Sequence, residues 1–285
     1  MMAVLDKLVS LLTLEQLEQQ LFRGHSQDLG FGHVFGGQVL GQALFAAQQT
    51  VPSGRLVHSY HSYFLRAGDI AQPIIYEVEN LRDGGSFSAR RVSAIQNGRP
   101  IFFMTASFQN PEKGLEHQIS MPAVGAPEQF PNEHQLAAIL TDRLPPAVVN
   151  QYLTNQAIEI RIAQDPHETL TDRTPQRSIW MRATGLESDD QSLHQFLLSY
   201  ASDFNFLTTA LKPHGIDWLS GQVKVATIDH SLWFHRPVRF DQWLLFVVDC
   251  PSTSNARGYV RGQIFDQAGQ LVASATQEGL VRQRD

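Results

Sequence analysis

Three polar side chains stand where the surrounding residues predict an apolar core. In the last predicted strand, Gln277 shares its face with Ala273 and Ala275, so an amide projects from the core-facing side. Thr227 follows two valines at alternate positions of an earlier strand, and Asp203 flanks an apolar stripe at helical spacing. A carboxylate beside a hydroxyl and an amide can bind and deprotonate a water molecule. Taken singly, each residue is more often a satisfied core polar group than a catalyst; together they form a candidate site.

Glycines are concentrated at the start of a helix predicted over 36–50. Gly36, Gly37 and Gly41 fall in its first turns, where each costs about 0.5–1 kcal/mol relative to alanine. Close packing of the helix against a sheet accounts for them. Backbone N–H groups at a helix N-terminus can also approach an anionic or carbonyl oxygen. The two interpretations are compatible, and the second makes Gly36 and Gly37 candidate oxyanion donors.

The sequence contains one layout twice. A His-Ser pair at 61–62 and another at 230–231 are each followed by bulky aromatic residues and then by an arginine. Downstream, the segments 97–99 and 268–270 have turn-forming sequences and separate runs of strand character. Each half is therefore predicted to contain a short strand, a helix and four longer strands rich in Val, Ile, Phe and Tyr.

A long helix followed by an antiparallel meander buries both apolar faces when the sheet curls around the helix. We therefore predict an α+β fold of two tandem modules, with long helices over 36–50 and 194–211 and an amphipathic helix over 4–21. The predicted units are an N-terminal module over 1–110, a proline-rich linker over 111–176 and a C-terminal module over 177–285.

Composition and charge exclude several classes of protein. A net charge of −6 argues against a nucleic-acid partner, which calls for a clustered basic surface. Cys250 is the only cysteine, so no internal disulfide or cysteine-rich zinc site is available, and we expect no metal or other cofactor. The sequence has no Gly-x-Ser-x-Gly elbow, phosphate-binding loop or dinucleotide fingerprint. Since no apolar run approaches the roughly 18 residues of a membrane span, we expect a soluble cytoplasmic protein.

Long segments of the chain closely resemble bacterial acyl-CoA thioesterase II, and the resemblance is weakest in the linker. The segments are Val34–Leu44, Val57–Asp69, Leu81–Gln109 and Thr227–Pro237. The resemblance implies a double hotdog fold, in which each curved sheet wraps one helix, and a homotetramer of such chains. It also implies a catalytic trio of Asp, Thr and Gln that falls on Asp203, Thr227 and Gln277 and hydrolyses acyl-CoA.

For such an enzyme we expect Asp203 to act as general base or orienter of a water molecule that the other two side chains hold, so that no acyl-enzyme is required. The tetrahedral oxyanion needs backbone donors, and a helix N-terminus is the expected source. Candidates for substrate binding or oxyanion stabilisation are Gly36, Gly37 and His58. Which half supplies the donors is left open by the sequence.

Two other functions fit parts of the pattern. A hotdog hydratase would add water to an enoyl-CoA with an Asp–His pair, for which Asp229 and His230 are the adjacent candidates, although neighbours in a strand point to opposite faces. A non-catalytic protein would bind acyl-CoA, release no CoA and have no use for the trio. Arg82, Arg90 and Arg91 are candidate contacts of the CoA phosphates, but we interpret them as solvated surface residues.

Overall fold

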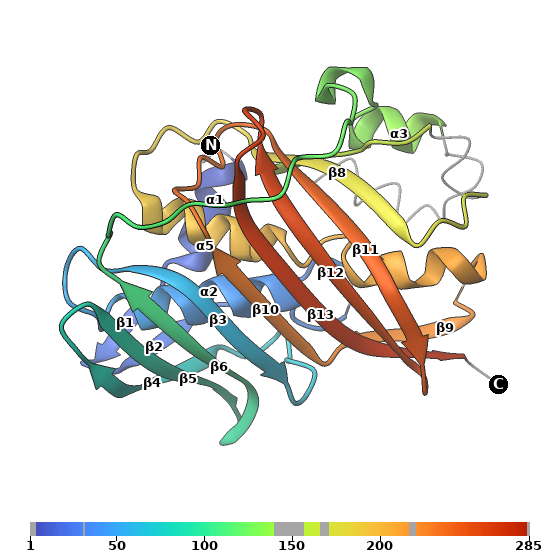
Figure 1. Ribbon diagram of the computed structural model, residues 1–285. Coiled ribbons are helices and arrows are strands. Elements are labelled where there is room, and N and C mark those ends of the chain that lie inside the picture. Colours follow the sequence, from blue (N-terminus) through green and yellow to red (C-terminus); the bar gives the residue numbers. More distant parts are fainter. Residues whose placement is uncertain (1–3, 31, 140–156, 166–170, 217–220, 284–285) are drawn as a thin grey trace.

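A computed structural model describes residues 4–30, 32–139, 157–165, 171–216 and 221–283 of the chain (Figure 1). The first half contains α1 (Val4–Leu12), β1 (Glu15–Glu18), β2 (Leu21–Gly24), α2 (Gly36–Gln48), β3 (Leu56–Phe64), β4 (Ile74–Asp83), β5 (Phe87–Gln96) and β6 (Arg99–Gln109). The segment after it contains η1 (Pro127–Gln129), α3 (Glu133–Ile139) and β7 (Ile158–Ile162). The second half contains β8 (Gln176–Ala183), α5 (Gln191–Ala201), η2 (Leu207–His214), β9 (Val223–Thr227), β10 (Asp229–Phe234), β11 (Leu244–Ser254), β12 (Arg257–Asp266) and β13 (Leu271–Gln283).

One antiparallel sheet runs through both halves. Its strands follow the order β1-β2-β4-β5-β6-β3-β10-β13-β12-β11-β8-β7, and β9 pairs with β13 beside this path. The halves join at β3 and β10, where His61 faces Ser231 and Ser62 faces His230. The Ser62 hydroxyl donates to the His230 carbonyl oxygen at 2.7 Å, and His61 Nδ1 lies 3.1 Å from Ser231 Oγ. The repeated segments therefore pair with each other at the centre of the molecule.

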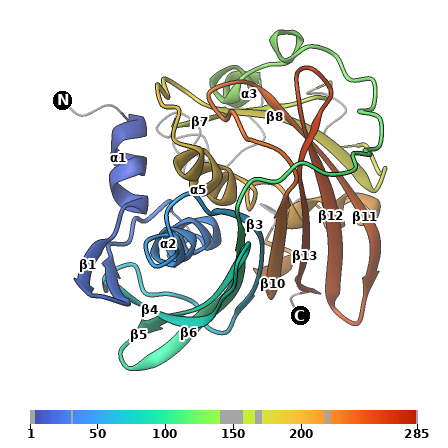
Figure 2. The ribbon, with the colours of Figure 1, turned by 60° about the vertical axis from the view of Figure 1, so that its left-hand side comes forward.

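The long helices α2 and α5 pack against each other, and Figure 2 shows α2 within the curve of β4, β5 and β6. A Cβ at Gly37 would lie 2.2 Å from the carbonyl oxygen of Tyr200 in α5, and one at Gly41 would lie 2.9 Å from Leu12. Glycine at these positions therefore permits close approach of the helices. The first half of the curved antiparallel sheet wraps α2, and the second half packs on η2, the continuation of α5, which confirms the predicted double hotdog fold.

The N-terminal helix is shorter than its sequence predicts. It ends at Leu12 rather than Leu21, because the following residues form the hairpin of β1 and β2. Glu15 and Arg23 face each other across this hairpin and form a salt bridge. The hairpin adds to β4 at the edge of the sheet, so strand pairing replaces the predicted helical turns.

The second long helix also ends early. It was predicted to continue to Leu211, but α5 ends at Ala201. Asn205 has a φ of 57°, in the left-handed region, so the chain turns before it continues as the 3₁₀ helix η2. Asp203 consequently lies in a turn after the helix rather than on the flank of a helix.

Hydrogen bonds at the ends of β3 and β10 define how the halves correspond. The N–H groups of Arg66 and the residue before it both donate to the same carbonyl oxygen of β6. In the same way, the N–H groups of Arg236 and the residue before it both donate to the same carbonyl oxygen of β13. These arginines therefore correspond, as predicted. Counting back along each strand places Tyr60, not His61, at the position of His230. The predicted match of the His-Ser pairs is thus displaced by one residue.

The segment between the modules adds to the second module. Its strand β7 pairs with β8 at the end of the sheet. The segment also runs across the β12–β13 turn, where Gln118 donates to the carbonyl oxygen of Gly269 at 2.8 Å and accepts from the Leu271 N–H at 3.1 Å (Figure 1). Residues 140–156 and 166–170 of the predicted linker lie outside the described residues. The exact module boundaries stay a proposal.

Candidate active site

The three predicted catalytic side chains meet at one point of the second module. Gln277 is fully buried in β13, and its Nε2 donates to Asp203 Oδ1 at 3.0 Å and to Thr227 Oγ1 at 2.6 Å. The amide therefore joins the carboxylate of the turn after α5 to the hydroxyl at the end of β9. Three elements that are far apart in sequence converge here, as the alternation of polar and apolar residues indicated.

The local fold accounts for the position of each side chain. Thr227 faces Gly279 in the register of β9 and β13, close to Gln277. Between β9 and β10, the Ile228 N–H donates to the Glu278 carbonyl oxygen at 2.9 Å, and β10 then pairs with the next part of β13. Asp203 lies just beyond Ser202, the C-terminal cap of α5. The early end of this helix turns the carboxylate toward the strands.

The N-terminal end of α2, from the first module, completes the site. The Gly37 N–H faces the Asp203 carboxylate and lowers its pKa, and a Cβ added at Gly36 would lie 2.6 Å from Asp203 Oδ2. Any larger residue at Gly36 would therefore displace the carboxylate. The positive end of a helix dipole also favours a negative charge at this place. The site is thus shared between the modules, although the trio itself belongs to the second.

Asp203 has the electrostatic properties of a general base. Burial raises the pKa of Asp203 from its ordinary value of 3.8 to about 6, whereas the Gln277 amide, the Gly37 N–H and the charge of His33 lower it. Burial and, less strongly, the Asp203 charge raise the pKa of Tyr60, so this phenol stays neutral beside the carboxylate. A carboxylate with a pKa near 6 is ionised at neutral pH and binds a proton more tightly than an ordinary aspartate.

His58 has different surroundings from the two glycines with which it was grouped. Its Nε2 lies 2.8 Å from Ser107 Oγ, and its ring meets that of Phe87 edge-on at 5.7 Å. Ser107 belongs to the partly exposed face of β6, whereas its neighbour Ala106 is buried. The structure thus brings Gly36 and Gly37 to the trio and places His58 elsewhere.

The Asp229–His230 pair does not form a unit, as the strand alternation indicated. Asp229 Oδ1 accepts from the Glu278 N–H at 2.8 Å. His230 is buried, and its Nε2 lies 3.1 Å from Ser202 Oγ. Within the described residues, no hydrogen bond connects the two side chains. An acid–base pair of the hydratase kind is therefore not assembled at these positions.

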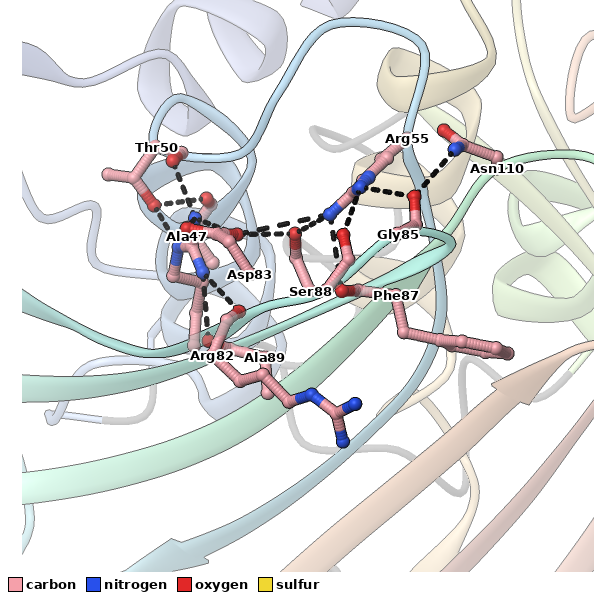
Figure 3. Close-up of polar contacts among 12 residues, drawn as sticks. Ala47, Thr50, Arg55, Arg82, Asp83, Gly85, Phe87, Ser88, Ala89 and Asn110 are labelled. Atoms are coloured by element: carbon pink, nitrogen blue, oxygen red, sulfur yellow. Dashed lines mark hydrogen bonds and ion pairs between the residues drawn. The ribbon is translucent and has the colours of Figure 1, made fainter.

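One buried arginine holds the opposite end of α2, and a second holds the nearby turn between β4 and β5, whose polar contacts are drawn in Figure 3. Arg90, which is fully buried, donates to Thr50 Oγ1 at 2.9 Å and to the Thr50 carbonyl oxygen at 2.8 Å, just beyond the helix, and pairs with Asp83 at 2.9 Å. Arg55 donates to the carbonyl oxygens of Gly84 and Gly85 at 2.6 and 2.7 Å. The interpretation of Arg90 as a solvated surface residue is therefore wrong. This arginine anchors the helix whose other end points at Asp203.

Sequence reasoning missed three neighbours of the trio. His33 faces Asp203 from the loop before α2, and Ser202 and Tyr60 lie behind the site. Ser202 precedes Asp203 in the sequence, whereas the proximity of His33 and Tyr60 depends on how the two modules pack, and no local pattern marks it. Among the described residues, no cluster of three or more His, Cys, Asp or Glu side chains could hold a metal ion, and no helix is long and apolar enough to cross a membrane.

Comparisons with known proteins identify the family of the chain. The family model for acyl-CoA thioesterase matches residues 152–280, and the model for the acyl-CoA thioesterase N-terminal domain matches 25–109. The chain is 45% identical to acyl-CoA thioesterase 2 of Haemophilus influenzae over 98% of each chain. It is 39% identical to human acyl-coenzyme A thioesterase 8 over 96% of this chain and 88% of that protein. The crystal structure of acyl-CoA thioesterase II TesB2 from Mycobacterium marinum superposes with a TM-score of 0.79 at 37% identity, covering 98% of this chain and 99% of that one. The chain therefore belongs to the acyl-CoA thioesterase family.

Proposed function

We propose that this acyl-CoA thioesterase hydrolyses its substrate by direct attack of a water molecule that Asp203 deprotonates, at one site in each chain. The observation that carries the proposal is the pair of hydrogen bonds by which Gln277 holds Asp203 and Thr227 together. A thioester carbonyl is less resonance-stabilised than an ester, so a positioned and deprotonated water attacks it without a covalent acyl-enzyme. The products are a free fatty acid and CoA.

Donors and acceptors within the trio define the role of each side chain. Both hydrogens of Gln277 Nε2 are engaged, so the Thr227 oxygen accepts from the amide and its own hydrogen is directed elsewhere. Thr227 thus donates to the bound water or to the substrate, and Asp203 accepts from the water. As the water oxygen bonds to the thioester carbon, its proton passes to Asp203. The C–S bond then breaks, and the proton returned by Asp203 leaves with CoA as the thiol.

The N-terminal end of α2 stabilises the oxyanion of the tetrahedral intermediate. This helix has 13 residues, and since its Gly37 N–H faces Asp203, we assign the Gly36 N–H as the donor to the reacting oxygen. Beside it, the rings of Phe35 and Phe204 stack with centroids 4.5 Å apart, so apolar side chains surround this end of the helix. The first module therefore contributes to the site even though it has no trio of its own.

The first module carries no equivalent of Gln277. Tyr60, which corresponds to His230, faces Ala106 across β3 and β6. Alanine at this position has no amide to hold a carboxylate and a hydroxyl. This difference between the halves supports one site per chain rather than two.

The proposal is tested by replacing Asp203, Thr227 and Gln277 singly by alanine and measuring release of the CoA thiol from acyl-CoAs of graded chain length. We expect kcat to fall at least about a hundredfold for Asp203→Ala, because general-base catalysis contributes about 10²–10⁴-fold. Thr276→Ala is the matched control, since Thr276 neighbours Gln277 in β13 but points to the other face. Folded variants with wild-type rates would remove the trio from the mechanism.

The same assays separate the other functions. Loss of enoyl absorbance without thiol release would identify a hydratase, and binding of acyl-CoA without thiol release would identify a non-catalytic protein. We also extend the proposal to a cytoplasmic homotetramer, the assembly that the family resemblance implies. Light scattering is then expected to report about four copies of the 31.9 kDa chain. A monomeric mass would contradict this extension alone.

A further inference from the structure

A buried glutamine fastens the middle of α2, the helix whose N-terminal end reaches the trio. Gln42 is fully buried, and its Nε2 donates to the carbonyl oxygens of Leu11 at 2.6 Å and of His25 at 2.9 Å. Its Oε1 accepts from the hydroxyl of Tyr76 at 2.7 Å and from the amide of Gln38 at 3.3 Å. Both donors and both acceptor positions of the Gln42 amide are thus occupied.

The partners of this amide come from different elements around α2. The last turn of α1 and the segment after β2 each provide a carbonyl oxygen, and β4 provides the hydroxyl; Figure 2 shows α1 and β4 on different sides of α2. The end of β2 approaches so closely that a Cβ at Gly24 would lie 2.9 Å from both Nε2 and Oε1 of Gln42. Gln38, one turn earlier on the same face of the helix, donates to the same His25 carbonyl oxygen at 3.0 Å. The two amides therefore join α2 to the segment after β2.

These hydrogen bonds fix the position of α2 along its axis. Burial of apolar side chains is non-directional, whereas hydrogen bonds have preferred distances and angles. Gln42 lies six residues beyond Gly36, which is about 9 Å along the helix at 1.5 Å per residue. Because a helix of this length moves as a unit, its N-terminal end follows any displacement of Gln42. At that end, the Gly37 N–H faces Asp203.

The corresponding glutamine in the second module provides an independent comparison. Gln195 lies seven residues before the C-terminal cap of α5, as Gln42 does in α2. Gln195 is also buried, and its Nε2 donates to the Val57 carbonyl oxygen at 2.9 Å, but its Oε1 has no hydrogen-bond partner within the described residues. The N-terminal end of α5 is capped by the side chain of the preceding residue, and the opposite end of this helix leads to Asp203. The amide is thus fully engaged in the helix whose N-terminal end lies at the site.

We propose that Gln42 is a positioning residue, which holds the N-terminal end of α2 at the place beside Asp203 that the reaction requires. This inference rests on the proposed function of the trio. The amide acts through the helix on the Gly37 N–H, which faces the carboxylate, and on the Gly36 N–H, which we assign to the reacting oxygen. Without the amide, α2 still packs against the sheet, but its end is no longer held in one position.

The test replaces Gln42 by methionine, which is also unbranched but removes the hydrogen bonds. We expect Gln42→Met to lower kcat about ten- to a hundredfold with little change in KM, because a displacement of about 1 Å near the reacting atoms has an effect of this size. The acid limb of the pH–rate profile should also move upward from about pH 6, since the Gly37 N–H then lowers the pKa of Asp203 less. The groups that face Asp203 from other elements are unchanged in this variant; they are Gln277 of β13, Tyr60 of β3 and His33 of the loop before α2.

Gln96→Met is the matched control for a loss of stability. Gln96 is buried in β5 of the same module, and its amide makes three hydrogen bonds with Asp69 and Gln72, in the loop after β3. Gln96→Met should therefore lower Tm without changing kcat or the acid limb. In a Gly36→Ala background, where the added Cβ already displaces the carboxylate, Gln42→Met should cause little additional loss of kcat.

Tyr76→Phe tests the inference even if Gln42→Met does not fold, because it removes one hydroxyl that donates to Gln42 and keeps the ring. It should change kcat and the acid limb in the same directions by smaller amounts. Unchanged kcat and acid limb in the folded variants, or additive losses of Gln42→Met and Gly36→Ala, would overturn the inference. An acid limb that moves equally in Gln96→Met would also overturn it, because any loss of stability would then have the same effect. Failure of the proposed function looks different, because Asp203→Ala would then release CoA at the wild-type rate.

Discussion

The buried carboxylate of Asp203 should make the folded protein less stable at neutral pH than a version that lacks its charge. The substitution Asp203→Asn removes the ionisation and keeps the size of the side chain. In the folded protein Asp203 holds its proton up to a pKa of about 6, whereas in the unfolded chain the ordinary value is 3.8. The folded state therefore binds the proton more tightly, and its stability falls as pH rises between these two values.

The magnitude follows from the two pKa values. At about 1.4 kcal/mol for each pKa unit, ionising Asp203 costs the folded protein roughly 3 kcal/mol at pH 8. About half of this cost is already present at pH 5, which lies between the two values. The free energy of unfolding of the wild type, relative to Asp203→Asn, should thus fall by about 1.5 kcal/mol from pH 5 to pH 8.

The assay is urea denaturation of both proteins at a series of pH values, with the difference between them plotted against pH. Contributions of other groups cancel in this difference, except for His33, whose charge faces Asp203. The series is therefore repeated with His33→Gln in both proteins. A difference that stays constant with pH, or that favours the wild type increasingly as pH rises, would refute the assignment of Asp203 as a buried, proton-binding base.

Three other predictions concern activity and packing. The kcat/KM should fall about tenfold per pH unit below about pH 6, because only ionised Asp203 accepts the proton of water; a flat profile down to pH 5 would exclude it as the base. Gly36→Ala should lower kcat about a hundredfold, because the added Cβ would lie 2.6 Å from Asp203 Oδ2. Gly114→Ala is the control and should keep the wild-type kcat, because no atom lies within 4 Å of its added Cβ. Equal kcat values for the two variants would contradict the geometry. Arg90→Met should lower the free energy of unfolding by about 1–3 kcal/mol, since it leaves the Thr50 carbonyl oxygen without its buried donor. Chemical denaturation measures this, and an unchanged midpoint would show that the anchor contributes nothing.

The alternation of residues along strands predicted two members of the site well. Gln277 interrupts an apolar face of β13, and Thr227 follows two valines of β9, so both were marked by period-2 patterns that any buried strand displays. Asp203 was predicted from its place beside apolar residues, but the helix that was predicted to contain it is longer than the helix in the structure. The turn at Asn205 depends on a left-handed backbone conformation that helical spacing does not reveal.

Relations between the modules were beyond reach of local patterns. The glycines of α2 suggested an oxyanion site, yet their contact with Asp203 depends on how α2 packs on α5. The displacement of the His-Ser match by one residue has a different cause. His61 lies five residues before Arg66, whereas His230 lies six residues before Arg236, and a one-residue shift in a strand exchanges buried and exposed faces. For this reason His61 is exposed while His230 is buried.

A single turnover in ¹⁸O-labelled water tests the central claim most directly. With enzyme in excess over acyl-CoA, mass spectrometry would measure ¹⁸O in the released fatty acid and in the peptide that contains Asp203. If water attacks the thioester carbon directly, one ¹⁸O atom enters the fatty acid and none enters the peptide. An acyl adduct on Asp203, or ¹⁸O in its carboxylate, would show that Asp203 attacks as a nucleophile and would contradict the account.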